Sequence, residues 1–175
     1  MKITLASLIT AVAFAISAQA DEVKLSNVHL CCPSCVKGVD KAVNAVEGAK
    51  ASCDADAGTI TLTAGDTAGL QKATDALVKA GYYGKSSDAK IKLEANTGAK
   101  GAKVQSLEVN SVHLCCPKCV KAVDAALKSV PGVKEQTATK GAKSFTVTGD
   151  FTDKDVFAAL QKAGLTGKVG PAAAN

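Results

Sequence analysis

The sequence predicts an α+β protein made of two tandem βαββαβ domains, and two observations support that architecture. A ten-residue segment at 28–37 returns at 112–121 with a single substitution, and the agreement between the two halves extends beyond it. Each half also passes between the two-residue period of a strand and the 3.6-residue period of a helix in the same order. A duplicated unit of this size is long enough to fold as a small domain.

The first twenty residues have the pattern of a secretory signal peptide. Lys2 supplies a positive charge, an apolar run extends over 3–16, and Ala18-Gln19-Ala20 offers a cleavage site. The apolar run is shorter than the roughly 20 residues that a membrane-spanning helix needs. We therefore expect cleavage near Ala20, a soluble mature chain without a membrane span, and a periplasmic or secreted location.

The internal repeat sets the expected domain boundaries. An offset of 84 residues brings Asp66 onto Asp150, and a one-residue adjustment brings 79–85 onto 162–168. A stretch without apolar periodicity lies between the two units and is typical of a flexible linker. The expected organisation is a signal peptide at 1–20, a first domain at 21–94, a linker at 95–104, a second domain at 105–170 and a tail at 171–175.

The first three elements of each domain follow from local patterns. Alternation of apolar and polar residues predicts a strand over 22–29. From Pro33 the apolar residues recur at helical spacing until Gly48, which predicts a helix between these two positions. A short strand is expected next, over 49–54.

The remaining elements complete the fold. A strand over 59–63 is followed by a helix with Asp66 or Thr67 as its N-cap, which ends at Gly81 before a short closing strand. The order βαββαβ predicts the ferredoxin-like sandwich, in which two helices cover one antiparallel sheet. The fold class is therefore α+β, with two such domains in tandem.

Composition excludes several functional classes. Every basic residue is a lysine, the lysines are spread along the chain, and aromatic residues make up only 3% of it. This distribution argues against nucleic-acid binding. The sequence also lacks a catalytic Ser/His/Asp set, a phosphate-binding loop and paired carboxylates, so we expect no enzyme.

Sulfur and imidazole are concentrated in the two copies of the repeated segment. The chain has seven cysteines and two histidines, and eight of these nine residues lie in the copies. Adjacent cysteines cannot easily join distant parts of a chain, so the pattern disfavours the disulfide framework typical of secreted proteins. The cysteines therefore indicate a binding or reactive site that occurs twice.

The position of the motif at a helix start suits metal binding. Pro33 favours the first helical position, which makes Cys32 an N-cap residue and places Cys35 in the first turn. The helix dipole there lowers thiol pKa values and favours the thiolate, and this placement should leave the sulfurs exposed. Two such sulfurs suit a two-coordinate soft ion such as Cu(I), or half of a tetrahedral zinc site. The second copy repeats this arrangement with Cys116, Pro117 and Cys119.

Two further side chains in each copy are candidate ligands. His29 and Cys31 project to the same side of an extended segment, so both could reach an ion held by Cys32 and Cys35. Cys31 is either a third sulfur ligand or a neighbour that diverges from the site. His29 is either a ligand or a strand-end histidine bonded to backbone. The same alternatives apply to Cys115 and His113.

Each unit resembles the heavy-metal-associated domain of copper chaperones, metal-transporting P-type ATPases and the periplasmic mercury-binding protein. The resemblance covers nearly the whole mature chain and rests on Cys-x-x-Cys at the junction of the first strand and first helix. It implies that the metal ligands are Cys32, Cys35, Cys116 and Cys119. The usual Gly-Met-Thr before this motif is His29-Leu30-Cys31 here, and His113-Leu114-Cys115 in the second copy. In the family, the residue matching Tyr82 lies near the metal, whereas Leu165 stands there in the second unit.

The resemblance implies an exported protein that sequesters or shuttles a thiophilic ion. Cu(I) is the favoured cargo, zinc or mercury are alternatives, and a metal-transport protein that docks transiently is the expected partner. A different hypothesis is a thiol–disulfide oxidoreductase that uses the two Cys-Pro-Xaa-Cys pairs. A third is a structural protein with inert disulfides. The absence of a thioredoxin-like architecture from the sequence pattern favours metal handling.

Overall fold

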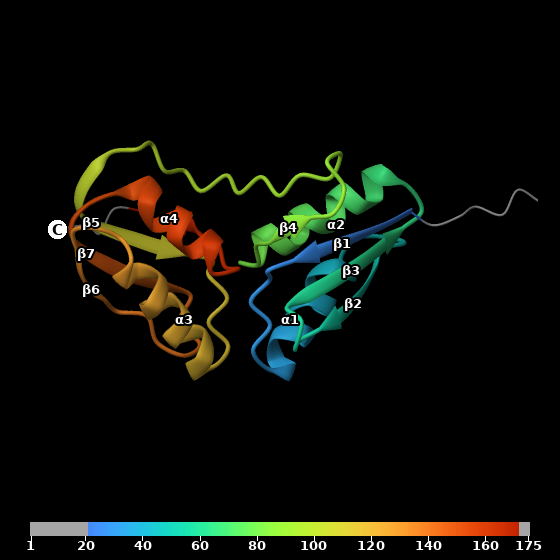
Figure 1. The fold of residues 1–175 in the computed structure, drawn as a ribbon, viewed down its shortest axis with the longest axis horizontal. Coiled ribbons are helices and arrows are strands. Elements are labelled where there is room, and N and C mark those ends of the chain that lie inside the picture. Colours follow the sequence, from blue (N-terminus) through green and yellow to red (C-terminus); the bar gives the residue numbers. More distant parts are fainter. Residues whose placement is uncertain (1–20, 172–175) are drawn as a thin grey trace, which may run out of the picture.

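The computed structural model describes residues 21–171, and within them the chain forms two domains that lie side by side (Figure 1). The predicted signal peptide and the last four residues of the predicted tail lie outside this range. No helix within 21–171 is long and apolar enough to cross a membrane.

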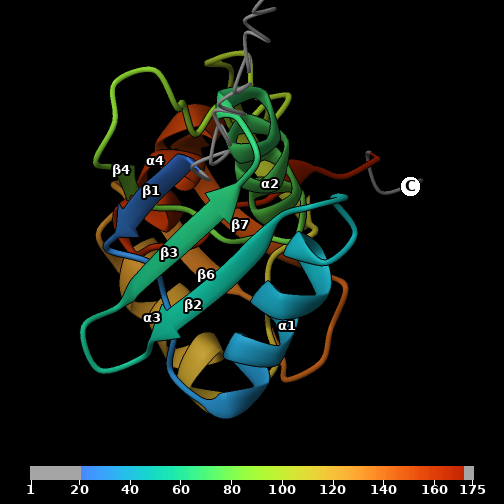
Figure 2. The ribbon, with the colours of Figure 1, turned by 90° about the vertical axis from the view of Figure 1, so that its right-hand side faces the viewer.

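The first domain has the predicted βαββαβ order. Its sheet is antiparallel with the strand order β2-β3-β1-β4. Figure 2 shows β1, β3 and β2 lying next to one another with α2 behind them. The elements are β1 (Asp21–Ser26), α1 (Pro33–Val43), β2 (Lys50–Asp54), β3 (Thr59–Ala64), α2 (Thr67–Lys79) and β4 (Lys85–Ser86).

The second domain repeats this plan, with the strand order β6-β7-β5-β8. The predicted fold class, two tandem ferredoxin-like α+β domains, is therefore confirmed. The elements are β5 (Lys103–Asn110), α3 (Pro117–Lys128), β6 (Val133–Gln136), β7 (Ser144–Thr152), α4 (Asp153–Lys162) and β8 (Lys168–Val169).

The first strand of each domain ends earlier than the alternating sequence pattern predicts. The predicted strand over 22–29 ends at Ser26, because Asn27 adopts a left-handed conformation with φ 59° and turns the chain out of the sheet. Ser111, with φ 62°, does the same after β5. The residues that follow form an extended loop, and this loop carries the cysteines away from the sheet edge. The first helix also ends at Val43, earlier than the predicted stop at Gly48.

The helices cover their sheets with a narrow apolar stripe. In α1, Cys35, Val39 and Val43 recur every four residues and are fully buried. Each buried valine contributes about 1.5–3 kcal/mol relative to an exposed one. Cys35 therefore occupies the first core position of the helix, and Cys119 occupies the corresponding position of α3.

The segment before β5 is held by a single carboxylate. Asp153, the first residue of α4, is 6% exposed and accepts hydrogen bonds from the backbone N–H groups of Lys100, Gly101 and Ala102 at 2.7–3.0 Å. Burial raises the pKa of Asp153, but these hydrogen bonds outweigh it and hold the pKa below its usual value. The stretch predicted as a flexible linker over 95–104 is thus fixed to the second domain at its C-terminal end.

Removal of this carboxylate has a defined cost. We expect Asp153→Ala to lower the free energy of unfolding by about 2–3 kcal/mol, because it leaves three backbone N–H groups without their hydrogen-bond acceptor. Asp155→Ala is the matched control: Asp155 lies exposed in the same helical turn, so its loss should cost only about 0.5 kcal/mol of dipole interaction. Urea denaturation of both variants measures the difference. Equal losses would show that Asp153 acts only through the helix dipole.

Candidate metal site

The two cysteine-bearing loops face each other across the junction between the domains. Each loop packs against the turn that follows the second helix of the other domain. Gly164 follows α4 with φ +78°, and a Cβ atom there would come within 2.5 Å of the His29 backbone nitrogen. Gly81 follows α2 with φ +90°, and a Cβ there would lie 2.5 Å from the Ser111 carbonyl oxygen. Only glycine permits so close an approach of the two backbones.

Backbone hydrogen bonds join the same surfaces. The carbonyl of Gly164 accepts from the N–H groups of His29 and Tyr83, both at 3.2 Å, and the carbonyl of Gly81 accepts from Thr166 at 3.0 Å. Tyr82 and Leu165 form an isolated antiparallel bridge between the domains. The docking is therefore specific, and its symmetry follows the internal repeat.

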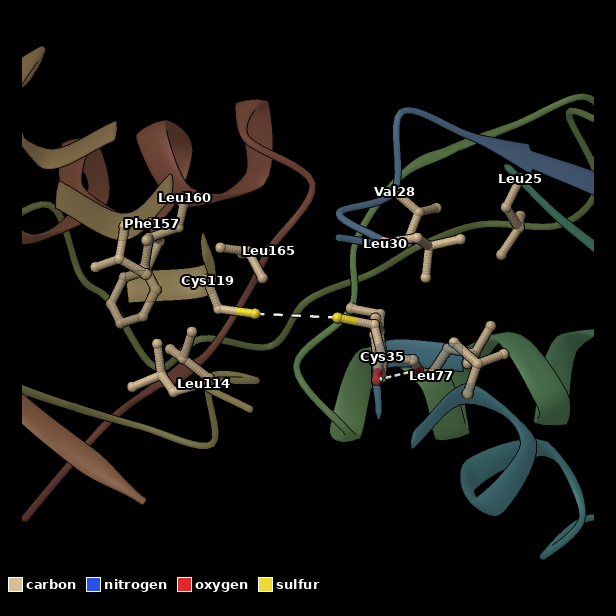
Figure 3. Packing of buried hydrophobic residues seen from close by; sticks show 14 of the residues in the cluster. Leu25, Val28, Leu30, Cys35, Leu77, Leu114, Cys119, Phe157, Leu160 and Leu165 are labelled. Atoms are coloured by element: carbon tan, nitrogen blue, oxygen red, sulfur yellow. Dashed lines mark hydrogen bonds between the residues drawn. The ribbon is translucent and has the colours of Figure 1, made fainter. Parts of the chain in front are cut away.

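This docking gathers six cysteines into one cluster. The closest sulfur pairs join the two domains: Cys31 Sγ lies 3.2 Å from Cys116 Sγ and 3.4 Å from Cys119 Sγ. Within a loop, the predicted pair Cys32 and Cys35 is 3.7 Å apart. Figure 3 shows Cys35 and Cys119 pointing at each other from opposite domains, at 4.0 Å. The structure thus brings together all six cysteines of the two motifs: Cys31, Cys32, Cys35, Cys115, Cys116 and Cys119.

The local geometry at the helix starts agrees with the sequence prediction, but the exposure does not. Cys32 and Cys116 are N-cap residues with a proline after them, and neither uses its side chain to cap the helix. Their sulfurs therefore stay available as ligands. Cys35 and Cys119, however, are 0% exposed, because each lies on the buried face of its helix and contacts the other across the junction. The expectation of freely exposed sulfurs is wrong for these two residues.

The two histidines occupy different environments. The Tyr82 hydroxyl donates to the Cys35 carbonyl at 2.7 Å and lies 3.1 Å from His113 Nε2, and the two rings are 4.6 Å apart. Because the Tyr82 hydroxyl proton is donated to the Cys35 carbonyl oxygen, the His113 Nε2 atom is the donor in its hydrogen bond with the Tyr82 oxygen. His29 has no such neighbour, since Leu165 stands in place of the tyrosine. Its Nε2 atom is buried and has no hydrogen-bond partner among residues 21–171.

Hydrogen bonds among the thiols separate their pKa values. A hydrogen bond from the Cys119 thiol outweighs burial and lowers the pKa of Cys35 to about 2, while the same contact raises the pKa of Cys119. Burial raises the pKa of Cys31 to about 12 and also raises that of Cys115. At Cys116 burial acts upward too, but hydrogen bonds from the backbone N–H groups of the helix start prevail and lower the pKa to about 6. Negative charge is thus concentrated on Cys35 and Cys116.

These shifts predict how stability depends on pH. Thiols with raised pKa values contribute stability that is present below pH 9 and is lost as pH rises toward 12. We expect the reduced, metal-free chain to lose unfolding free energy over that range, measured by anaerobic urea denaturation. The decline should be smaller in the Cys31→Ser, Cys115→Ser double variant. A curve that is flat or rising above pH 9 would contradict the assigned directions.

Some residues lie outside the site, and others were missed by sequence reasoning. Cys53 lies half-buried on β2, where burial raises its pKa to about 11, and it takes no part in the cluster.

Gly81 and Gly164 were not predicted as site residues, although they determine how the loops meet. The sequence does mark these two glycines as equivalent, because the triplet Lys-Ala-Gly recurs at 79–81 and 162–164. The triplet alone did not reveal that its glycine contacts the opposite domain.

The sulfur separations favour particular coordination numbers. A metal–sulfur bond of about 2.3 Å separates the sulfurs of a linear site by about 4.6 Å, of a trigonal site by about 4.0 Å and of a tetrahedral site by about 3.8 Å. The sulfur pairs in closest contact are 3.2–4.0 Å apart, and each of the six sulfurs has at least two such neighbours. The cluster therefore suits an ion with three or four sulfur ligands.

Comparisons with known proteins found a family model and several solved structures that are similar to this chain. The family model of the heavy-metal-associated domain matches residues 108–166. Similar solved structures include a copper-binding domain from HMA7, a P-type ATPase, with 22% identity over 39% of this chain and 96% of its own, at a TM-score of 0.36. The N-terminal domain of PacS from Synechocystis PCC6803 has 19% identity over 39% of this chain and 100% of its own, at a TM-score of 0.35. The N-terminal soluble domains of Bacillus subtilis CopA have 14% identity over 87% of this chain and 95% of their own, at a TM-score of 0.34.

No curated protein matches the chain. The family match covers α3, which carries the second cysteine motif, and most of the second sheet. The first half repeats both the strand order and the Cys-Cys-Pro-Xaa-Cys segment of the second. The chain is thus a tandem of two like units, of which the second matches the family model of the heavy-metal-associated domain over residues 108–166.

Proposed function

We propose that the chain is an exported protein that binds a thiophilic metal ion at the junction of its two domains and sequesters or shuttles it. One observation carries this proposal: the shortest sulfur–sulfur distances, 3.2 and 3.4 Å, join cysteines of different domains. Two independent sites would have no reason to place their sulfurs in contact. The proposal of export rests on the signal-peptide pattern of residues 1–20.

The donor set favours a soft ion. Six thiols and one imidazole nitrogen lie within reach of one another, and no carboxylate belongs to any of the ligand groups within residues 21–171. Thiolate-rich sites select Cu(I), zinc and other thiophilic ions over Mg²⁺, Ca²⁺ or Mn²⁺. Cu(I) is the favoured cargo because three-coordinate sulfur suits it, while Zn(II) and Hg(II) are alternatives.

Two open grooves give the cargo access to the cluster. One, of about 680 Å³, is lined by Cys31 and Cys32 together with Lys37 and Lys118. The other is lined by His113, Leu114 and Cys115 of the second motif. A partner that offers its own thiolates could exchange the ion at these half-exposed sulfurs, while Cys35 stays covered. Such exchange would need only transient docking of a metal-transport protein, which is the partner that we propose.

Anaerobic titration of the reduced chain with Cu(I), Zn(II) and Hg(II), beside an insulin-reduction assay, tests the function. We expect tight, stoichiometric binding of at least one of these ions and no catalysis of disulfide exchange. Cys32→Ser combined with Cys116→Ser should weaken binding, whereas Cys53→Ser is the matched control and should not. Failure to bind any of the three ions, together with insulin reduction, would favour the thiol–disulfide oxidoreductase instead.

A further inference from the structure

The donor atoms of the cluster form four groups of three. In each group the three atoms lie within 4.8 Å of one another, which is close enough for one ion to bind all three after small adjustments. The groups are His29–Cys31–Cys119, Cys31–Cys32–Cys116, Cys32–Cys35–Cys115 and Cys115–Cys116–Cys119.

These groups share their sulfur atoms. Five thiols each belong to two groups: Cys31, Cys32, Cys115, Cys116 and Cys119. A thiolate has enough lone pairs to bridge two soft ions, so a shared sulfur is a bridging ligand when both of its groups are filled. Five bridging thiols, with Cys35 and His29 used once each, supply the twelve metal–ligand bonds that four three-coordinate ions need.

A buried ring nitrogen without a hydrogen-bond partner also indicates that an ion binds in one of these groups. His29 Nε2 is buried with no hydrogen bond inside the described range, which costs about 1–3 kcal/mol unless a partner binds it. The His29 ring belongs to the group with Cys31 and Cys119, so an ion in that group that binds Nε2 would give this atom a partner. His113 cannot play this part through its own Nε2, because that atom is bonded to Tyr82.

We propose that the junction holds up to four Cu(I) ions as a single thiolate-bridged cluster, with His29 Nε2 as its one nitrogen ligand. This inference rests on the proposed function and specifies the form in which the cargo is bound. Each Cu(I) replaces thiol protons, which leave to solvent, and no change of oxidation state occurs. Six thiolates and four monovalent ions leave a net charge of −2, and Lys37 and Lys118 line the groove beside it.

Loading of the reduced, full-length mature chain with Cu(I) under anaerobic conditions tests this proposal. Native mass spectrometry should show mainly the metal-free and four-copper species, because bridged sites fill cooperatively. X-ray absorption at the copper edge should show copper–copper scattering. Saturation at one or two ions without copper–copper scattering would overturn the cluster and leave the proposed function standing. No tight binding of Cu(I), Zn(II) or Hg(II) would overturn both.

The two histidines provide a matched pair of variants. His29→Ala should bind three ions and lose the nitrogen contribution to the copper absorption spectrum. His113→Ala removes the same side chain from the repeated position and should retain four ions and that contribution. Circular dichroism of the metal-free variants checks that both remain folded. Equal copper content and unchanged nitrogen scattering in both variants would eliminate His29 as a ligand.

Discussion

Replacement of Gly164 by alanine is expected to weaken metal binding about ten- to hundredfold, although the residue is not a ligand. Its Cβ would come within 2.5 Å of the His29 nitrogen and 2.6 Å of the Asn27 carbonyl oxygen. Such overpacking costs about 1–3 kcal/mol, and each 1.4 kcal/mol corresponds to about a tenfold loss of affinity. Relief of the overlap requires the loop that carries Cys31 to move away. Competition with a Cu(I) chelator measures the change.

Gly81→Ala should act in the same way from the other domain, because its Cβ would meet the Ser111 oxygen and the His113 nitrogen. Gly48→Ala is the matched control. Gly48 also has a positive φ, +72°, but no atom lies within 4 Å of its added Cβ. It should therefore lose stability of about 1 kcal/mol through backbone strain and keep its metal affinity. Equal affinities in Gly164→Ala and Gly48→Ala would contradict a site that depends on docking.

Metal loading is expected to raise the melting temperature of the reduced chain by at least about 20 °C. Binding to sulfur-rich sites that exist only in the folded chain contributes about 10 kcal/mol or more to stability, and 1 kcal/mol shifts the midpoint of a chain of this size by about 2–4 °C. Because the ligands come from both domains, the loaded chain should unfold in one transition. Differential scanning calorimetry with and without Cu(I) measures both effects.

The control for this prediction is the Cys35→Ser, Cys119→Ser variant. Both thiols are fully buried at the centre of the junction, and serine is close to cysteine in shape. We expect the metal-free variant to fold, and its stabilisation by Cu(I) to be much smaller than that of the native chain. A loaded native chain in which the two domains melt separately would show that the metal does not join them.

The sequence was sufficient for the fold because each element has a local signal. The helix starts at Pro33 and Pro117 and the cap at Asp66 appear as predicted. The end of the first strand was not predictable from period alone. Apolar residues still alternate after the strand, at Val28 and Leu30, although one residue out of phase with Val23 and Leu25. The left-handed backbone at Asn27, and at Ser111 in the second domain, ends the strand at this break.

The candidate site was predictable only one domain at a time. The N-cap position of Cys32 and the first-turn position of Cys35 follow from the proline between them. Whether Cys31 approaches the sulfurs of the second motif depends on the docking of two domains, which no periodicity within one repeat specifies. The same is true of the histidines, since His29 and His113 are distinguished by the exchange of Tyr82 for Leu165 on the facing turn.

The proposed metal site needs both loops, one from each domain. The direct test is the metal content and affinity of a chain in which Cys31, Cys32 and Cys35 are all replaced by serine, while the second motif stays intact. A shared site predicts fewer than half of the native number of ions, each bound at least about tenfold more weakly. Half of the native number of ions, bound with native affinity, would contradict the claim, because the second domain would then bind metal alone.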